Sequence, residues 1–173
     1  MSANFGAEHD DSAEQFWQFS LAIYPMLQTE LLALQDQYSC NVNLLLLTAW
    51  RSLLAPLPVL LQELSPLNLT TRQIRNVRRE LSQRLLLTPA DPLLSKLRQQ
   101  LLDTELTAER LEQRALVRCC ADTSHCHVAA VSLRQQYLDS HQVPPPIQQQ
   151  LTFDLDQALL QLEQSSGFVP AKC

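Results

Sequence analysis

The chain has 173 residues, of which 46% are hydrophobic and 18% charged, with a formal net charge of −5 and only two glycines. Those glycines, Gly6 and Gly167, lie near the two ends, so residues 7–166 contain none. Phosphate-binding loops, tight β-turns and strained nucleophile turns need glycine for positive φ angles or close backbone approach, so the composition excludes several large enzyme classes. It does not select a function.

No segment reaches the roughly 18 uncharged apolar residues that a membrane span requires. The first eight residues have neither the basic nor the apolar region of a signal peptide. The five cysteines are odd in number and include the adjacent pair Cys119 and Cys120, which is a poor disulfide framework. We therefore expect a cytoplasmic protein with free thiols and no cofactor.

Capping residues and prolines mark the predicted helices. Residues 1–11 are expected to be a flexible N-terminus, because Ser12 resembles the N-cap of a first helix. Pro25 should end or kink that helix and begin a second one. Asn41 is expected to cap a third, leucine-rich helix, and Thr70 is one of two threonines suited to cap the next.

Asp91 followed by Pro92 is a strong start signal for the longest helix, whose apolar residues alternate at spacings of three and four over three heptads. A weaker helix is predicted from about Cys126 to Leu138. It completes a helical domain over residues 12–140. Beyond it we predict a Pro/Gln-rich extended linker over 141–151, an amphipathic helix over 152–164, and a frayed tail over 165–173. The predicted fold is all-α, a single helical bundle of about six to eight helices. The residues expected in its core are Trp17, Phe19, Leu45, Leu46, Trp50, Leu97 and Leu101.

Charge is distributed unevenly along the chain. Residues 1–50 carry six acidic and no basic side chains, whereas residues 72–118 hold ten of the thirteen basic side chains against six acidic ones. Guanidinium groups at helical spacing could bind a phosphate or carboxylate partner. The pI of about 5.3 and the absence of aromatic residues from 72–118 speak against nucleic acid. We expect the basic face to lie near acidic groups of the same protein, among them Asp36, Glu30 or Glu14.

Several polar residues are candidates for a pocket between helices. Asn43 directly precedes the leucine run, and a buried asparagine must be hydrogen-bonded. It fits either an interhelical network or a polar pocket, because helical bundles place ligand sites between facing helices. Glu105, Glu109 and Glu112 have helical spacing but lack the Glu-x-x-His partners of a di-iron bundle, so we expect them on a solvated face paired with Arg110 and Arg114. We assign no catalytic residues. The candidate binding residues are Trp17, Gln35, Asp36, Asn43, Arg75, Arg78, Arg79, Glu105 and Glu109.

A cluster of thiols and imidazoles offers the one candidate metal site. Cys120 and Cys126, with His125 or His127, form the best ligand set. Structural zinc sites favour paired ligands separated by two to four residues, whereas neighbouring members of this cluster are directly adjacent. A loop at a helix end with incidental thiols and histidines is the other reading.

The chain resembles a known family in several motifs. They are FWQFSLAIY at residues 16–24, LQD at 34–36, NVNLLLL at 41–47 and ELTAERLEQ at 105–113. This pattern is similar to a family of short uncharacterised proteobacterial proteins, classed as a domain of unknown function. The resemblance covers roughly residues 14–118, and the remainder departs from the pattern. It implies a cytoplasmic bacterial helical protein and no assigned activity.

Two functions remain open. The first is a non-enzymatic protein-interaction or regulatory factor, whose partner is another protein rather than a membrane or a nucleic acid. The second is a helical small-molecule binder or unrecognised enzyme with a polar pocket between helices. A cleft that joins Asn43, Arg75 and Glu109 would favour the second, whereas salt bridges among these groups outside a filled core would favour the first.

Overall fold

The computed structural model describes residues 4–89, 91–122, 124 and 126–166. Six helices account for most of this part of the chain, which confirms the all-α prediction. They are α1 (Asn4–Tyr38), α2 (Val42–Trp50), α3 (Leu57–Leu87), α4 (Pro92–Ala121), α5 (Ala130–Ser140) and α6 (Pro145–Ser166). The short strands β1 (Leu53–Leu54) and β2 (Val128–Ala129) pair antiparallel and tie the start of α3 to the start of α5.

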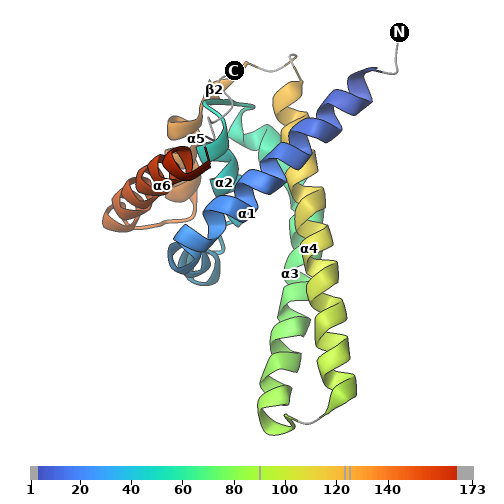
Figure 1. Cartoon of the computed structure of the whole chain (residues 1–173). Coiled ribbons are helices and arrows are strands. Elements are labelled where there is room, and N and C mark those ends of the chain that lie inside the picture. The colour runs from blue at the N-terminus through green and yellow to red at the C-terminus, as the bar shows by residue number, and fades with distance from the viewer. Residues whose placement is uncertain (1–3, 90, 123, 125, 167–173) are drawn as a thin grey trace.

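The helices form a head and a long projecting hairpin (Figure 1). In the head, α1 packs against α2 and α6, and α2 also packs against α5. Helices α3 and α4 pack against each other along their length and extend away from the head as an antiparallel hairpin. Helix α1 crosses α4 where the hairpin leaves the head, and we call this junction the hairpin root.

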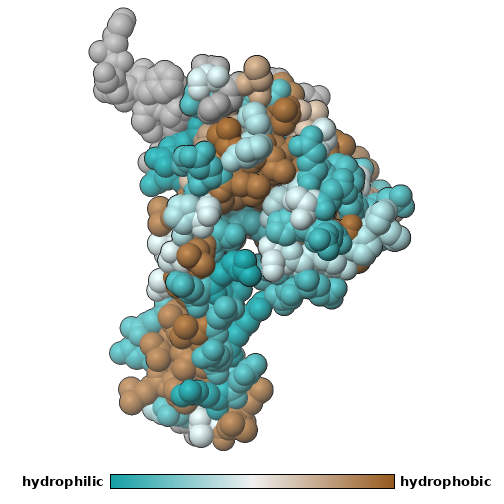
Figure 2. Space-filling view, turned by 180° about the vertical axis from the view of Figure 1, so that it is seen from behind, coloured by the Kyte–Doolittle hydropathy of each residue, from teal (hydrophilic) through white to brown (hydrophobic). Residues whose placement is uncertain are grey.

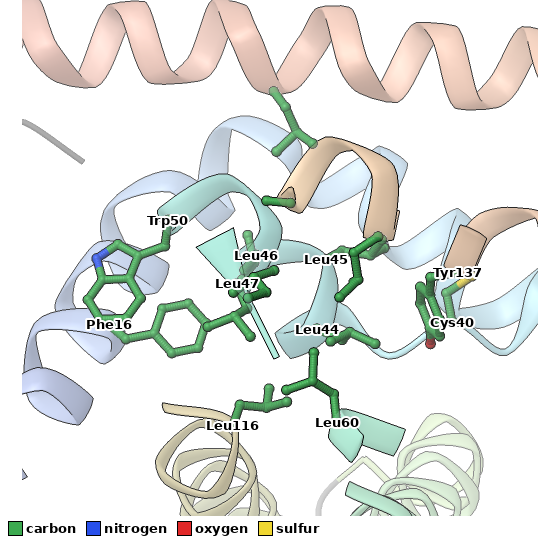
Figure 3. Close-up of a cluster of buried hydrophobic side chains, with 14 of the residues drawn as sticks. Phe16, Cys40, Leu44, Leu45, Leu46, Leu47, Trp50, Leu60, Leu116 and Tyr137 are labelled. Carbon is green, nitrogen blue, oxygen red and sulfur yellow. The ribbon is translucent and has the colours of Figure 1, made fainter. Parts of the chain in front are cut away.

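Helix α2 lies at the centre of the core. Seven of its nine residues are buried, as expected for a helix that is apolar nearly all round. Figure 3 shows Phe16 of α1 beside Trp50 of α2, and their ring centroids lie 4.9 Å apart. Leu60 of α3 and Leu116 of α4 are fully buried beneath α2. The root of the hairpin is therefore anchored in the core of the head.

Two of the N-caps predicted from sequence, Asn41 and Asp91, are present. Asn41 Oδ1 accepts a hydrogen bond from Leu44 N at 2.9 Å, and α2 begins directly after it. Asp91 Oδ1 accepts from the backbone nitrogens of Leu93 and Leu94 at the start of α4. Both satisfy N–H groups that have no partner within a helix.

Two prolines, Pro25 and Pro66, do not end helices, whereas α3 ends at Leu87, just before Pro89. Helix α1 continues through Pro25, and α3 continues through Pro66 past both threonines that were expected to cap it. Each proline lies on an exposed face, so water can hydrate the carbonyl group that loses its donor four residues earlier. The buried residues Ile23 and Leu27 continue the apolar stripe on either side of Pro25 and hold α1 together.

The boundaries predicted at the two ends also change. Helix α1 begins at Asn4, so it includes residues 4–11, which were expected to precede it, and the N-cap predicted at Ser12 is wrong because Ser12 lies inside the helix. Helix α6 begins at Pro145, so the extended linker predicted over 141–151 is wrong from that residue on. Proline suits the first turn of a helix, and buried Gln148 secures this one by donating to Val143 O at 2.7 Å. The predicted helix over 152–164 is the rest of α6. Of the predicted tail, residues 167–173 lie outside the described part of the chain.

The core prediction holds in the head and fails along the hairpin. Phe19, Leu45, Leu46 and Trp50 are at most 2% exposed, and Trp17 is half-buried. On α4, Leu101 is half-buried and Leu97 is 45% exposed, because this part of the helix packs on α3 alone. Within the described residues, no helix has the combined length and apolarity that a membrane crossing demands.

Candidate functional site

A buried polar network crosses the hairpin root. Glu112 of α4 is 1% exposed, and its Oε2 accepts hydrogen bonds from the side-chain nitrogens of Asn41 and Asn43, both at 2.9 Å. Gln113 Nε2 donates to Asn43 Oδ1 at 2.8 Å and to Ser20 Oγ at 3.0 Å. The network joins α1, the start of α2 and the face of α4 that points into the head. Each of these residues is at most 8% exposed.

The turn before α2 brings Asn41 into this network. Ser39 takes a left-handed backbone conformation with a φ of 58°, and Cys40 N donates back to Leu34 O at 3.2 Å. This closes the end of α1 in the manner of a helix C-cap. The backbone N–H of Asn41 donates to the hydroxyl of buried Tyr137, so α5 also holds the turn in place.

Arginines of α3 meet glutamates of α4 one turn further along the hairpin. Arg75 Nε lies 2.8 Å from Glu105 Oε1, and Arg75 Nη2 lies 2.7 Å from Glu109 Oε1. Arg78 pairs with the other oxygen of Glu105. Glu105 and Glu109 are four residues apart and therefore share one face of α4, which is the face that α3 covers. The solvated face predicted for these glutamates is wrong, since Glu105 is 4% exposed.

The two glutamates that Arg75 holds differ in their pKa. Burial pushes the pKa of Glu105 upward, but the hydrogen bonds from Arg78 and Arg75 outweigh burial and bring it below its ordinary value. Burial dominates at Glu109 and raises its pKa, although Arg75 acts in the opposite direction. Glu105 is therefore the more firmly ionised of the two.

Two further ion pairs connect the hairpin to α1. Arg79 Nη2 pairs with Asp36 Oδ1 of α1 at 2.6 Å, so the basic face does meet one of the acidic partners expected for it. Arg110 Nη2 instead pairs with Glu14 Oε2 at 2.7 Å, and its guanidinium lies over the Trp17 ring. Arg110 therefore contacts residues of α1 and not the glutamates of its own helix that were expected to pair with it.

Two adjoining hollows open at the hairpin root. The polar hollow has a volume of about 200 Å³ and is lined by the turn before α2 together with polar residues of α3 and α4. The apolar hollow has a volume of about 340 Å³ and is walled by Trp17, Leu21, Leu46, Leu102 and Leu106. The hollows adjoin because both are lined by Gln35, Val42, Asn43, Arg75, Arg79 and Glu109. Figure 2 shows hydrophilic surface in the angle between hairpin and head, where the molecule is hollowed.

All nine candidate binding residues line one or both hollows. Sequence reasoning therefore selected residues that the fold brings together, and their binding role stays a prediction. The spacing alone predicts a solvated face for Glu112 and no role for Gln113, and it places Arg72 only among the ten basic residues of 72–118. The spacing of Glu112 could have indicated its burial, since it lies seven residues after Glu105 and four before the buried Leu116, on one face of α4.

The arrangement leaves specific polar atoms without a partner. Within the described residues, Glu112 Oε1 and Gln113 Oε1 are buried and accept no hydrogen bond. Glu112 lines the polar hollow and Gln113 lines the apolar one. Leaving a buried acceptor unsatisfied costs about 1–3 kcal/mol, so such atoms call for a donor from a ligand or from ordered water.

The candidate metal ligands do not assemble in the described residues. Cys126 is exposed, and the imidazole Nε2 of His127 lies 3.0 Å from the backbone oxygen of Cys120. His125 lies outside the described part of the chain. Among described residues, no three His, Cys, Asp or Glu side chains are grouped to hold a metal ion.

Comparison with known proteins yields a family and no further relative. No curated protein and no solved structure matches the chain. The model of a family described as a protein of unknown function (DUF2390) matches residues 15–116, which run from the first turns of α1 to the inner end of α4. This range contains both hollows' lining residues and agrees with the resemblance seen in the sequence. The chain belongs to this family of unknown function.

Proposed function

We propose that the protein is a non-enzymatic binder of a small organic molecule, held at the hairpin root between α1, α2, α3 and α4. The observation that carries the proposal is that Asn43, Arg75 and Glu109 line two adjoining hollows with buried unsatisfied acceptors. A cleft that joins these three residues is the feature expected of a binder, and Arg75 and Glu109 form their ion pair in its wall.

The size and lining of the site suit an organic ligand. Small-molecule sites commonly occupy about 300–1,000 Å³ and combine apolar walls with a few polar groups that fix orientation. The apolar hollow, at about 340 Å³, has this character, with Trp17 on one side and the Arg75 cluster on the other. The arginines and glutamates of that cluster are already paired, so they form a fixed polar wall and not a set of reactive groups.

The proposal is tested by filling the apolar hollow. Leu106 lines it and is 40% exposed, whereas Leu97 lies on the same helix, is 45% exposed, and lines neither hollow. Leu106→Trp should fill the site at little cost in stability, and Leu97→Trp is the matched control. A low-molecular-weight extract of bacterial cells should raise the melting temperature of the wild type and of Leu97→Trp, but not of Leu106→Trp. Equal responses from all three proteins, or none from any, would reject the proposal.

A second candidate is interaction with another protein through the free end of the hairpin. Leu86, Leu87 and Leu93 are 80%, 85% and 76% exposed, and Figure 2 shows hydrophobic residues interspersed with hydrophilic ones at this end, away from the head. Clustered exposed leucines are typical of a surface that packs against an apolar helix of a partner. Replacing Leu87 with lysine should abolish capture of such a partner while leaving the hollows unchanged.

We also infer a cytoplasmic location. The thiols of Cys40 and Cys119 are buried and form no disulfide, which suits a reducing compartment. Burial raises the pKa of each of these thiols to about 11, so they act as small apolar side chains.

A further inference from the structure

The charges that line the polar hollow are nearly all paired within the protein. Arg79 is held by Asp36, and Arg75 is held by Glu105 and Glu109. Two charged residues of the lining, Glu112 and Arg72, enter no ion pair within the described residues. The lining of the hollow therefore includes one acidic and one basic side chain without an ion-pair partner in the described part of the chain.

These two residues lie at opposite depths. Glu112 is 1% exposed, and its Oε1 is a buried acceptor without a donor among the described residues. Arg72 is exposed, and its Nη2 donates only a long hydrogen bond of 3.5 Å to Ser39 Oγ. A group that donates hydrogen bonds and carries positive charge fits the inner end, and an anionic group fits the outer end.

The shared lining of the two hollows adds a third requirement. Val42 and Asn43 line both hollows, so the apolar walls that include Trp17 and Leu106 lie next to the polar hollow and offer a place for an apolar part of the molecule. That part would replace water along apolar walls, which favours binding by about 25 cal/mol for each Å² of apolar surface buried.

We propose that the ligand is a small zwitterion, an amino-acid-like molecule with a primary ammonium group, a carboxylate and a short apolar skeleton. The ammonium group donates to Glu112 Oε1, the carboxylate meets the guanidinium of Arg72, and the apolar skeleton lies in the apolar hollow. This inference rests on the proposed function and narrows it to one class of ligand.

The test uses two isomers that differ in the separation of their charges, L-leucine and 6-aminohexanoate, measured by isothermal titration calorimetry on the full chain. Three relatives of L-leucine each lack one feature. They are 3-methylbutylamine without the carboxylate, 4-methylpentanoate without the ammonium group, and glycine without the apolar part. One of the two isomers should bind with a dissociation constant below about 1 mM, and loss of either charge should weaken binding at least about 10-fold.

Two variants assign the charges to residues. Arg72→Ala should weaken binding of the zwitterion about 10-fold and leave binding of 3-methylbutylamine unchanged, whereas Arg84→Ala, on the exposed outer part of α3, should change neither. Glu112→Gln keeps the shape of the side chain and its acceptor for Asn41 and Asn43, and it should weaken binding of the amine and the zwitterion alike. Because Arg72 is exposed, its variant stays informative even if Glu112→Gln folds poorly.

The outcomes separate the ligand class from the proposed function. If cell extract stabilises the wild type but not Leu106→Trp, while neither isomer binds, the zwitterion is wrong and the binding function stands. If the extract does not stabilise the wild type and neither isomer binds, both the ligand class and the binding function are rejected, and Glu112 Oε1 is satisfied by water alone. Binding of an isomer that Arg72→Ala and Glu112→Gln leave unchanged would also overturn the assignment.

Discussion

Replacing Arg75 with methionine should destabilise the protein more than any other change at an arginine of α3. Its side chain is 13% exposed and forms ion pairs with Glu105 and Glu109. The side chain of Glu105 is 5% exposed, and that of Glu109 is 27% exposed. Removing one partner of a buried ion pair costs about 3–5 kcal/mol. Arg78 still holds Glu105 and water still reaches Glu109, so we expect a loss of about 2 kcal/mol.

Urea unfolding at pH 7 measures this loss, with Arg84→Met as the matched control. Arg84 is exposed on the outer part of the same helix, and its replacement should change stability by less than about 0.5 kcal/mol. A double-mutant cycle with Glu109→Gln should give a coupling energy of about 1 kcal/mol. If Arg75→Met costs no more than Arg84→Met, the ion-pair cluster does not stabilise the hairpin root and our account of it is wrong.

Four further predictions follow from the structure. Leu46→Ala, at a position 2% exposed, should cost about 2–5 kcal/mol, and an unchanged unfolding midpoint would remove α2 from the core. The folded-state pKa of Glu105 lies below its ordinary value of 4.5, so its ionic contribution is present above that pH and lost as the pH falls through the folded pKa. The stability difference between wild type and Glu105→Gln should therefore shrink on acidification, and a constant difference would contradict the pairing. Leu87→Gln, at a position 85% exposed, should leave the free energy of unfolding within about 0.5 kcal/mol of wild type, whereas a larger loss would mean that the hairpin end is packed. Charge reversal at Arg75 and Arg79 should weaken folding without removing any nucleic-acid affinity, and salt-sensitive DNA or RNA binding by the wild type would refute this.

The helix starts could be predicted where the signal is local. Asn41 and Asp91 cap their helices through atoms two or three residues away, so their roles are set by the adjacent sequence. Proline is different, because its effect depends on the face of the helix on which it lies. Pro25 and Pro66 lie on exposed faces of helices that continue through them because of tertiary packing, and one-dimensional spacing does not reveal that packing.

The difference between local signals and tertiary packing also explains which features of the candidate site could be predicted. Asn43 could be selected because it directly precedes a strongly apolar run, and the arginines and glutamates because they recur at helical spacing. The partners of Glu105 could not be predicted, because a glutamate with helical spacing is equally suited to a solvated face or to contact with a facing helix. The choice depends on α3, which begins 48 residues earlier and folds back as the other arm of the hairpin. Burial of Glu112 likewise depends on α2 lying across the hairpin root.

The claim at the centre of this account is that the hairpin root holds a small molecule. Native mass spectrometry of the protein purified from bacterial cells tests it most directly, followed by denaturation to release and weigh whatever was bound. The account predicts a wild-type species heavier than the chain by the mass of one small organic molecule, retained by Leu97→Trp and lost from Leu106→Trp. A bare chain mass for the wild type under conditions that keep it folded, or an adduct retained equally by both variants, would contradict it.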